Sequence, residues 1–145
     1  MRDPSELVEW LMAAKTPTIR YLTARDLLGL AEEDEQLYAA RAAIMQEGAV
    51  PAILAKQTEA GHWTGERNYY SPKYVSTHWS LLLLTELRVD PNDERFQRGV
   101  DFMLTDTIER LQYSKGDLAC FWGNVLEYAV YANRADDPRT QAIAQ

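Results

Sequence analysis

The stretch that decides the fold is residues 57–87, which read QTEAGHWTGERNYYSPKYVSTHWSLLLLTEL. Its first half, residues 57–73, is a long connection rich in glycine and aromatic residues. Structureless loops longer than about 12–15 residues are uncommon in compact domains and are often functional. The connection therefore has two interpretations: a functional loop, or a cover that packs its aromatic side chains across helix ends. Its second half, residues 75–87, is apolar on all sides and predicts a helix that is buried all round.

Helical patterns continue on both sides of this stretch. Four shorter helices are predicted before residue 57. The capping or first-turn residues of the first three are Pro4, Thr16 and Asp34, and the fourth follows Gly48 and ends at Leu54. After it, residues 93–104 predict a helix with one wet face, residues 119–132 a second apolar helix, and Asp136 the start of another polar-faced helix. No segment alternates with period two, so we expect an all-α fold in which buried and half-buried helices form an inner and an outer layer.

The alternation has a period. Trp79 and Trp122 lie 43 positions apart, each early in an apolar helix, and Asp93 and Asp137 lie 44 apart, each followed two residues later by arginine. A period of about 40–47 residues with two helices is typical of repeat proteins, in which each pair needs its neighbours to bury its faces. We therefore predict one domain over residues 1–145, with repeats at residues 16–57, 58–104 and 105–145.

Three residues of the connection suggest how successive pairs are held together. Gly61 can adopt the positive φ that turns the chain away from a helix end. The amide of Gln57 can pair with free backbone groups there, and Trp63 offers a large apolar plate with one N–H. These properties predict a structural role for all three residues.

The spacing Gln57-x-x-x-Gly61-x-Trp63, followed by an apolar helix with Trp79, resembles the repeat motif of squalene cyclases and their relatives. The resemblance implies the double-layered α/α toroid shared by terpenoid cyclases and protein prenyltransferase β subunits. About eight helices are expected in this chain, against about a dozen in a closed ring, so we expect an incomplete ring and an N-terminal segment of a longer repeat protein. An incomplete ring leaves an apolar repeat end exposed, which predicts a homo-oligomer.

The catalytic motifs of those relatives are incomplete, so the sequence leaves open whether the chain is an enzyme. The Asp-x-Asp-Asp box of the cyclases is absent, and we interpret Asp136 and Asp137 as helix caps. His78, Cys120 and Asp117 resemble the zinc ligands of the prenyltransferases, but in a different order and spacing. A buried core cysteine and a hydrogen-bonded histidine are the alternative, and we predict no metal and no cofactor.

Two hypotheses for function remain open. In the first, the amino ends of the inner helices form a mouth that binds an apolar, isoprenoid-like small molecule, an identification that rests on the resemblance. The second is a non-catalytic helical-repeat module that binds another protein. The candidate ligand-binding residues are Trp63, Tyr69, Tyr70, Tyr74, Thr77, His78, Cys120, Phe121 and Asn124.

Composition excludes several classes of partner. The 145 residues carry a net charge of −7 without any basic cluster, so we expect no nucleic-acid partner. The longest apolar block is too short to cross a bilayer, and a single cysteine fits the cytoplasm.

Glu86 and Glu127 interrupt otherwise apolar helices, and a buried carboxylate must pair, so we expect an arginine such as Arg25 or Arg98 beside them.

Overall fold

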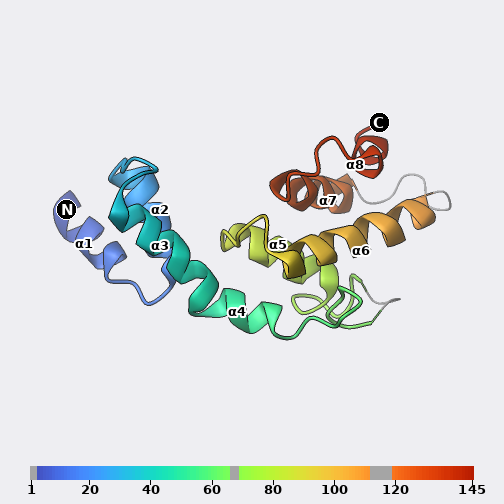
Figure 1. Ribbon diagram of the computed structural model, residues 1–145, viewed down its shortest axis with the longest axis horizontal. Helices are drawn as coiled ribbons and strands as arrows, with labels where there is room; N and C mark the ends of the chain where they lie inside the picture. The colour runs from blue at the N-terminus through green and yellow to red at the C-terminus, as the bar shows by residue number, and fades with distance from the viewer. Residues whose placement is uncertain (1–2, 66–68, 112–118) are drawn as a thin grey trace. The chain divides into compact units, whose positions relative to one another are not determined.

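The computed structural model describes residues 3–65, 69–111 and 119–145 (Figure 1). For residues 106–111 it describes the backbone and not the side chains. Every regular element in these ranges is helical and none is a strand, so the predicted all-α fold is confirmed. The chain divides into two compact units, Met1–Ala52 and Ile53–Gln145, and the division falls inside helix α4 (Ala49–Leu54). The single domain and the three repeat boundaries stay predictions.

The first unit consists of α1 (Pro4–Met12), α2 (Pro17–Leu22), a π-helical turn (Thr23–Leu27), α3 (Glu35–Gln46) and the start of α4. The carboxylate of Asp34 accepts a hydrogen bond from the Gln36 amide at 2.8 Å and so caps α3 as expected. Thr16 occupies the capping position of α2, although its side chain makes no capping hydrogen bond within the described residues. The segment from α2 to the π-helical turn packs against α3, and α1 buries no residue. The core side chains here are Tyr21, Ala24, Leu37, Ala40 and Ile44.

The second unit contains two helix pairs, α5 (Thr77–Glu86) with α6 (Glu94–Leu111), and α7 (Ala119–Tyr131) with α8 (Pro138–Ile143). Helix α5 packs against α7, and α6 packs against α8, so successive pairs lie side by side in the same order (Figure 1). Helix α6 continues to Leu111, so the expected end at Leu104 is wrong. The fully buried side chains between these helices include Leu81, Leu84, Val89, Phe96, Val100, Met103, Leu104, Val125 and Tyr128.

The two pairs share the same turn, which fixes their register. Arg88 after α5 and Asn133 after α7 both adopt the left-handed conformation, with φ of 61° and 60°. In each turn the left-handed residue donates its N–H three residues back and the next residue donates five residues back, the Schellman pattern that ends many helices. Positions 45 apart in α5 and α7 are therefore structurally equivalent.

This register corrects the pairing of tryptophans. Trp79 is equivalent to Asn124, and Trp122 is equivalent to Thr77, so the expectation that Trp79 and Trp122 correspond is wrong. Two positions along a helix correspond to about 200° of rotation, because each residue turns by about 100°. The helix ends define the repeat more reliably than the matching residue types do.

The aspartates that open the outer helices are equivalent, as their 44-residue spacing predicts. Asp93 accepts from the Arg95 amide and Asp137 from the Arg139 amide, both at 2.9 Å, and each carboxylate also binds the guanidinium of the same arginine. Asp137 is the capping residue of α8, whereas Asp136 lies exposed in the turn before it. The interpretation of both Asp136 and Asp137 as caps is therefore confirmed only for Asp137.

The Gln57, Gly61 and Trp63 motif acts as predicted from its chemistry. Gln57 Nε2 donates to the carbonyls of Gly61 and of Arg95 on α6, at 3.1 and 2.8 Å, and Trp63 Nε1 donates to the Ile53 carbonyl in α4 at 2.8 Å. Gly61 has a φ of 93°, and a Cβ atom there would lie 2.8 Å from the Arg98 carbonyl oxygen. The motif thus joins the end of α4 to α6.

Candidate functional site

Aromatic rings gather at the amino ends of α5 and α7. His78 lies centrally, with its ring centroid 4.7 Å from that of Phe121 and 5.5 Å from that of Tyr70. Tyr70 also contacts Trp79 at 5.4 Å, and Tyr69 contacts Phe121 at 5.7 Å. These spacings are those of tilted and edge-to-face aromatic pairs. We call Tyr69, Tyr70, His78, Trp79 and Phe121 the aromatic cluster.

His78 is fully buried within this cluster. Its Nδ1 atom lies 3.4 Å from the Tyr128 hydroxyl, and its Nε2 atom has no hydrogen-bond partner among the described residues. Burial lowers the pKa of His78 to about 4, because a charged imidazolium would lose its hydration there. Burial likewise raises the pKa of the Tyr128 hydroxyl. The pair is therefore neutral near pH 7, and the expectation of a fully hydrogen-bonded histidine is wrong at Nε2.

Backbone and side-chain hydrogen bonds fix the connection across the start of α5. The carbonyl of Tyr69 accepts from the His78 amide at 2.8 Å, and the carbonyl of Tyr70 accepts from Trp79 Nε1 at 3.0 Å. The amide of Trp63 donates to Thr77 Oγ1 at 3.2 Å. The described part of the connection therefore packs its aromatic side chains across helix ends, which is the second of its two interpretations.

The structure brings together some of the predicted ligand-binding residues and separates others. Tyr69, Tyr70, His78 and Phe121 lie in the aromatic cluster, and Thr77 lies buried beside it. Trp63 belongs instead to the motif that joins α4 to α6.

Three further candidates lie outside the cluster. Tyr74 contacts Trp79 but is 74% exposed. Cys120 is exposed, so the interpretation of this residue as a buried core cysteine is wrong. Asn124 is half-buried on α7. Tyr74 and Cys120 are therefore in contact with water, whereas His78 is fully buried.

No group of three potential metal ligands occurs within the part of the chain that the structure describes. Asp117, one of the three residues that resemble zinc ligands, lies outside the described residues. Cys120 is exposed and His78 is buried among aromatic rings.

Helix α7 presents an exposed face made of Gly123, Glu127 and Val130, which we call the open face of α7. These positions follow one another at intervals of four and three residues and so lie on one side of the helix. Val130 is 53% exposed. The equivalent positions of α5 are His78, Leu82 and Thr85, and His78 and Thr85 are 0% and 3% exposed.

On the other side of the two helices the difference in burial is reversed: α5 is exposed there and α7 is buried. Leu83 and Glu86 of α5 are exposed, the former by 43%, and we call them the open face of α5. Their equivalents in α7 are Tyr128, which is fully buried, and Tyr131, whose hydroxyl donates to the Val89 carbonyl at 2.7 Å. The expectation that both apolar helices are buried all round is therefore wrong: each buries the side that faces the other.

This arrangement also changes the interpretation of the two glutamates. Glu86 and Glu127 are exposed on the open faces, so neither carboxylate requires a buried arginine. Arg25 pairs instead with Asp26, its Nε atom 2.6 Å from the carboxylate. The expected pairing of these glutamates with Arg25 or Arg98 is wrong, because the carboxylates remain in water.

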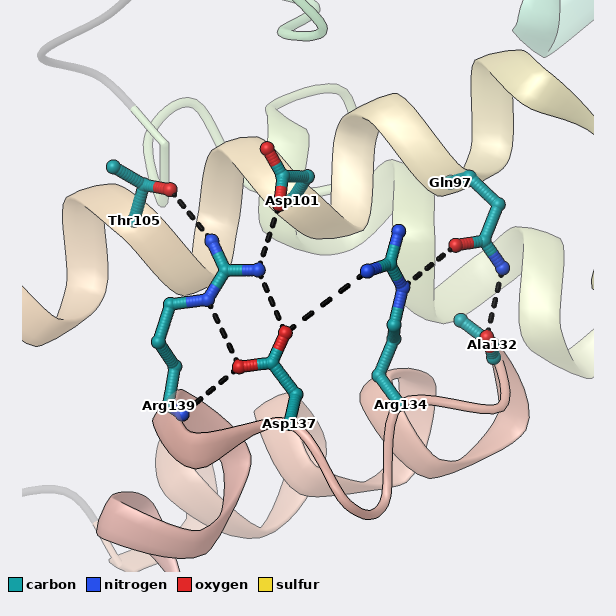
Figure 2. A network of polar contacts seen from close by, with 7 residues as sticks. All are labelled: Gln97, Asp101, Thr105, Ala132, Arg134, Asp137 and Arg139. Carbon is teal, nitrogen blue, oxygen red and sulfur yellow. Dashed lines mark hydrogen bonds and ion pairs between the residues drawn. The ribbon is translucent and has the colours of Figure 1, made fainter.

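A polar network joins α8 to α6 on the outer side (Figure 2). Arg139 donates to Asp137, to Asp101 at 2.7 Å and to Thr105 at 2.8 Å. The hydrogen bonds that Asp137 accepts from the Arg139 guanidinium, first, and from the Arg139 amide lower the pKa of Asp137 to about 2, together with the charges of Arg139 and Arg134. Arg139 thereby links the cap of α8 to two side chains on successive turns of α6.

The same network reaches the end of α7 through Gln97 of α6. Its Nε2 atom donates to the carbonyl of Ala132 at 2.7 Å, and its Oε1 atom accepts from Arg134 Nε at 2.8 Å (Figure 2). The turn between α7 and α8 is therefore held by side chains of the preceding outer helix. We infer a structural role for these polar groups.

Sequence reasoning missed three features of this region. Trp79 was a marker of the repeat and not a site candidate, although it contacts Tyr70, Tyr74 and His78. Tyr128 is not among the predicted site residues, and the apolar character of its helix predicts a buried carboxylate at its neighbour Glu127. A carboxylate within an apolar helix also marks an exposed face, and this signal could have indicated the open face of α7.

Comparison of the chain with protein-family models, with curated proteins and with solved structures gives no match. The resemblance to squalene cyclases therefore stays a proposal. Among the described residues, no helix combines the length and the apolar character needed to cross a bilayer.

Proposed function

We propose that the second unit is a non-catalytic helical-repeat module that binds a helix of a protein partner on the open face of α7. The observation that carries this proposal is the exchange of burial between equivalent positions. Thr85 of α5 is buried, whereas its equivalent, Val130 of α7, is half exposed. In repeat proteins each unit buries its face against its neighbour, so we expect an uncovered face to receive another helix.

The arrangement of the two helix pairs supports the wider interpretation of the chain. The pairs follow the same order and share the same turn, and Gln57, Gly61 and Trp63 join α6 of the first pair to α4. We propose on this basis that the chain is a squalene cyclase-like repeat protein with an incomplete α/α-toroid arrangement.

The chemistry of the aromatic cluster supports binding over catalysis. Burial lowers the pKa of His78 to about 4, so its imidazole is uncharged near pH 7. A general acid or base works best with a pKa near the operating pH and within reach of a substrate. The first condition is not met at His78, because burial lowers its pKa to about 4.

A peptide-display selection tests the proposed function. A library of amphipathic helical peptides is selected on the wild-type protein, and the enriched peptides are titrated against wild type and Val130→Glu. Burial of a valine side chain contributes about 1.5–3 kcal/mol, so we expect the variant to bind at least about tenfold more weakly.

The control is Tyr38→Glu, which changes an exposed aromatic residue of the first unit, 72% exposed against 53% for Val130. It should bind the enriched peptides like wild type. If no peptide is enriched, or if Val130→Glu binds as tightly as wild type, the proposed function is wrong.

The aromatic cluster favours a second candidate, an apolar small molecule with one polar group. The unpartnered Nε2 atom of His78 lies among aromatic rings and could bind such a group. Titration with long-chain isoprenoids should then raise the melting temperature of wild type and leave that of Phe121→Ala unchanged. Equal behaviour of the two proteins, or no shift in either, would exclude this candidate.

A further inference from the structure

We propose that the helix received by the open face of α7 is α5 of a second copy of this chain, an inference that rests on the proposed function. The second unit carries both halves of one repeat contact. Inside the unit, α5 packs against α7. The two open faces lie at positions equivalent to the two sides of this contact, and their side chains are exposed.

The internal contact shows which surfaces belong together. His78 faces α7 from α5, as the 3.4 Å approach of Tyr128 to His78 shows, and Tyr131 of α7 binds the Val89 carbonyl in the turn after α5. Thr85 is buried and lies seven residues after His78, on the same side of α5. Each side of this contact is built on positions three to seven residues apart, which form one stripe of a helix.

The open faces repeat these stripes at equivalent positions. Val130 on α7 corresponds to Thr85, and Leu83 on α5 corresponds to Tyr128. The open face of α7 therefore has the place in the repeat that receives a following helix, and the open face of α5 has the place that packs on a preceding one. When the two come from different copies, the contact continues the order of helices that exists inside the unit.

Such a contact is heterologous, since it joins two different surfaces. A heterologous contact leaves one open face of each kind at the ends of every assembly, so it does not stop at a dimer unless the rotation closes a ring. The mass of the assembly should therefore rise with protein concentration beyond twice the 16.6 kDa of the monomer.

Charge makes this contact dependent on salt. Glu127 on the open face of α7 and Glu86 on that of α5 are both exposed, and like charges repel. The chain as a whole also carries a net charge of −7. Because salt screens exposed charges, association should strengthen as the ionic strength rises.

Sedimentation velocity of wild type and two single variants, from micromolar to millimolar concentration, tests the inference. Val130→Glu removes the apolar centre of the open face of α7, and Leu83→Glu removes that of α5. Both side chains are exposed, and circular dichroism and thermal melting confirm that the variants fold. Tyr38→Glu is the control in the first unit and should associate like wild type.

The expected result is complementation. Each variant alone stays a monomer at concentrations where wild type associates, and an equimolar mixture forms a dimer with twice the monomer mass, because each variant still has the face that the other lacks. The dimer should also be more populated at high salt than at low salt.

Three results would overturn the inference. A wild-type protein that stays monomeric at every concentration and salt would exclude the second copy as partner, while the proposed function would still be decided by the peptide selection. Self-association of Leu83→Glu with a monomeric Val130→Glu would indicate a contact between two α7 helices. The absence of dimers in the mixture would exclude a heterologous contact.

Discussion

The helix pairs α5–α6 and α7–α8 have the same turn, the same cap and opposite exposed sides. Arg88 and Asn133 end the inner helices in the same conformation, and Asp93 and Asp137 open the outer ones with the same hydrogen bonds. The side that α5 buries is nevertheless the side that α7 exposes. Local structure in this unit follows from the local sequence, whereas burial follows from which neighbour is present.

The largest expected effect tests this exchange directly at equivalent positions. Tyr128→Ala should lower the free energy of unfolding by about 3–5 kcal/mol, because it removes a fully buried ring. Leu83→Ala, at the equivalent position of α5, should cost about 1 kcal/mol or less, because that side chain is 43% exposed. Urea unfolding of both variants measures the difference.

Tyr128→Phe separates the ring from the hydroxyl. It keeps the packing and loses only the approach of the hydroxyl to His78, so we expect a cost of about 1 kcal/mol. Equal costs for Tyr128→Ala and Leu83→Ala would show that the two helices bury the same side.

The second prediction concerns the pH dependence of stability. His78 has a pKa of about 4 in the folded protein against an ordinary 6.5, so the unfolded state binds a proton more readily between these values. Stability from this residue is complete above pH 6.5 and falls as the pH drops toward 4. Between pH 7 and pH 5 the expected loss is about 2 kcal/mol.

The variant His78→Phe isolates this contribution, because carboxylates titrate identically in both proteins. Urea unfolding at the two pH values should show a loss in wild type that is about 2 kcal/mol larger than in the variant. The same loss in both proteins would show that His78 is not buried in its neutral form.

The third prediction compares the two outer-helix caps. Asp137 binds an arginine that also reaches α6, whereas no ion pair or hydrogen bond to another helix is found for the described side chain of Arg95. Asparagine still caps a helix, so the exchange removes mainly the charge. Asp137→Asn should cost about 1–2 kcal/mol, and Asp93→Asn less.

The neighbouring Asp136→Asn is the matched control for Asp137→Asn. Asp136 is exposed in the turn, so its exchange should stay within about 0.5 kcal/mol of wild type. The acid titration gives a second readout: the stability from Asp137 is complete above pH 3.8 and is lost as the pH falls through about 2. If Asp136→Asn cost as much as Asp137→Asn, the network of Figure 2 would not hold α8.

The smallest expected effect is on the open face itself. Val130→Ala should change the free energy of unfolding of the monomer by less than about 0.5 kcal/mol, since most of the side chain is in water. Thermal melting at low concentration measures this change. A destabilisation comparable to that of a core exchange would show that Val130 is covered within its own chain.

The local features of the fold were predictable from single residues. Asp34 and Asp137 indicate helix starts, because a short carboxylate accepts hydrogen bonds from the free backbone amides there. Gly61 indicates a turn, because few other residues adopt its φ. The roles of Gln57 and Trp63 followed from their hydrogen-bonding groups.

The features that depend on neighbours were not predictable in this way. The residue types suggest that Trp79 is equivalent to Trp122 in the repeat, but the helix ends show that it is equivalent to Asn124. Glu127 lies in a helix whose composition predicts burial all round, and its exposure depends on the absence of a described helix on that side of α7. The candidate site was only partly predicted for the same reason, since Cys120 and Tyr74 face water and His78 does not.

The central claim is that α7 exposes the face that α5 buries, and thiol labelling at two equivalent positions tests it most directly. In a Cys120→Ser background, at a concentration where the protein is monomeric, Thr85→Cys and Val130→Cys are labelled in the native state. We expect the thiol at position 130 to react almost as fast as in the unfolded chain, and the thiol at position 85 at least about a hundredfold more slowly. Equal rates at the two positions would contradict it.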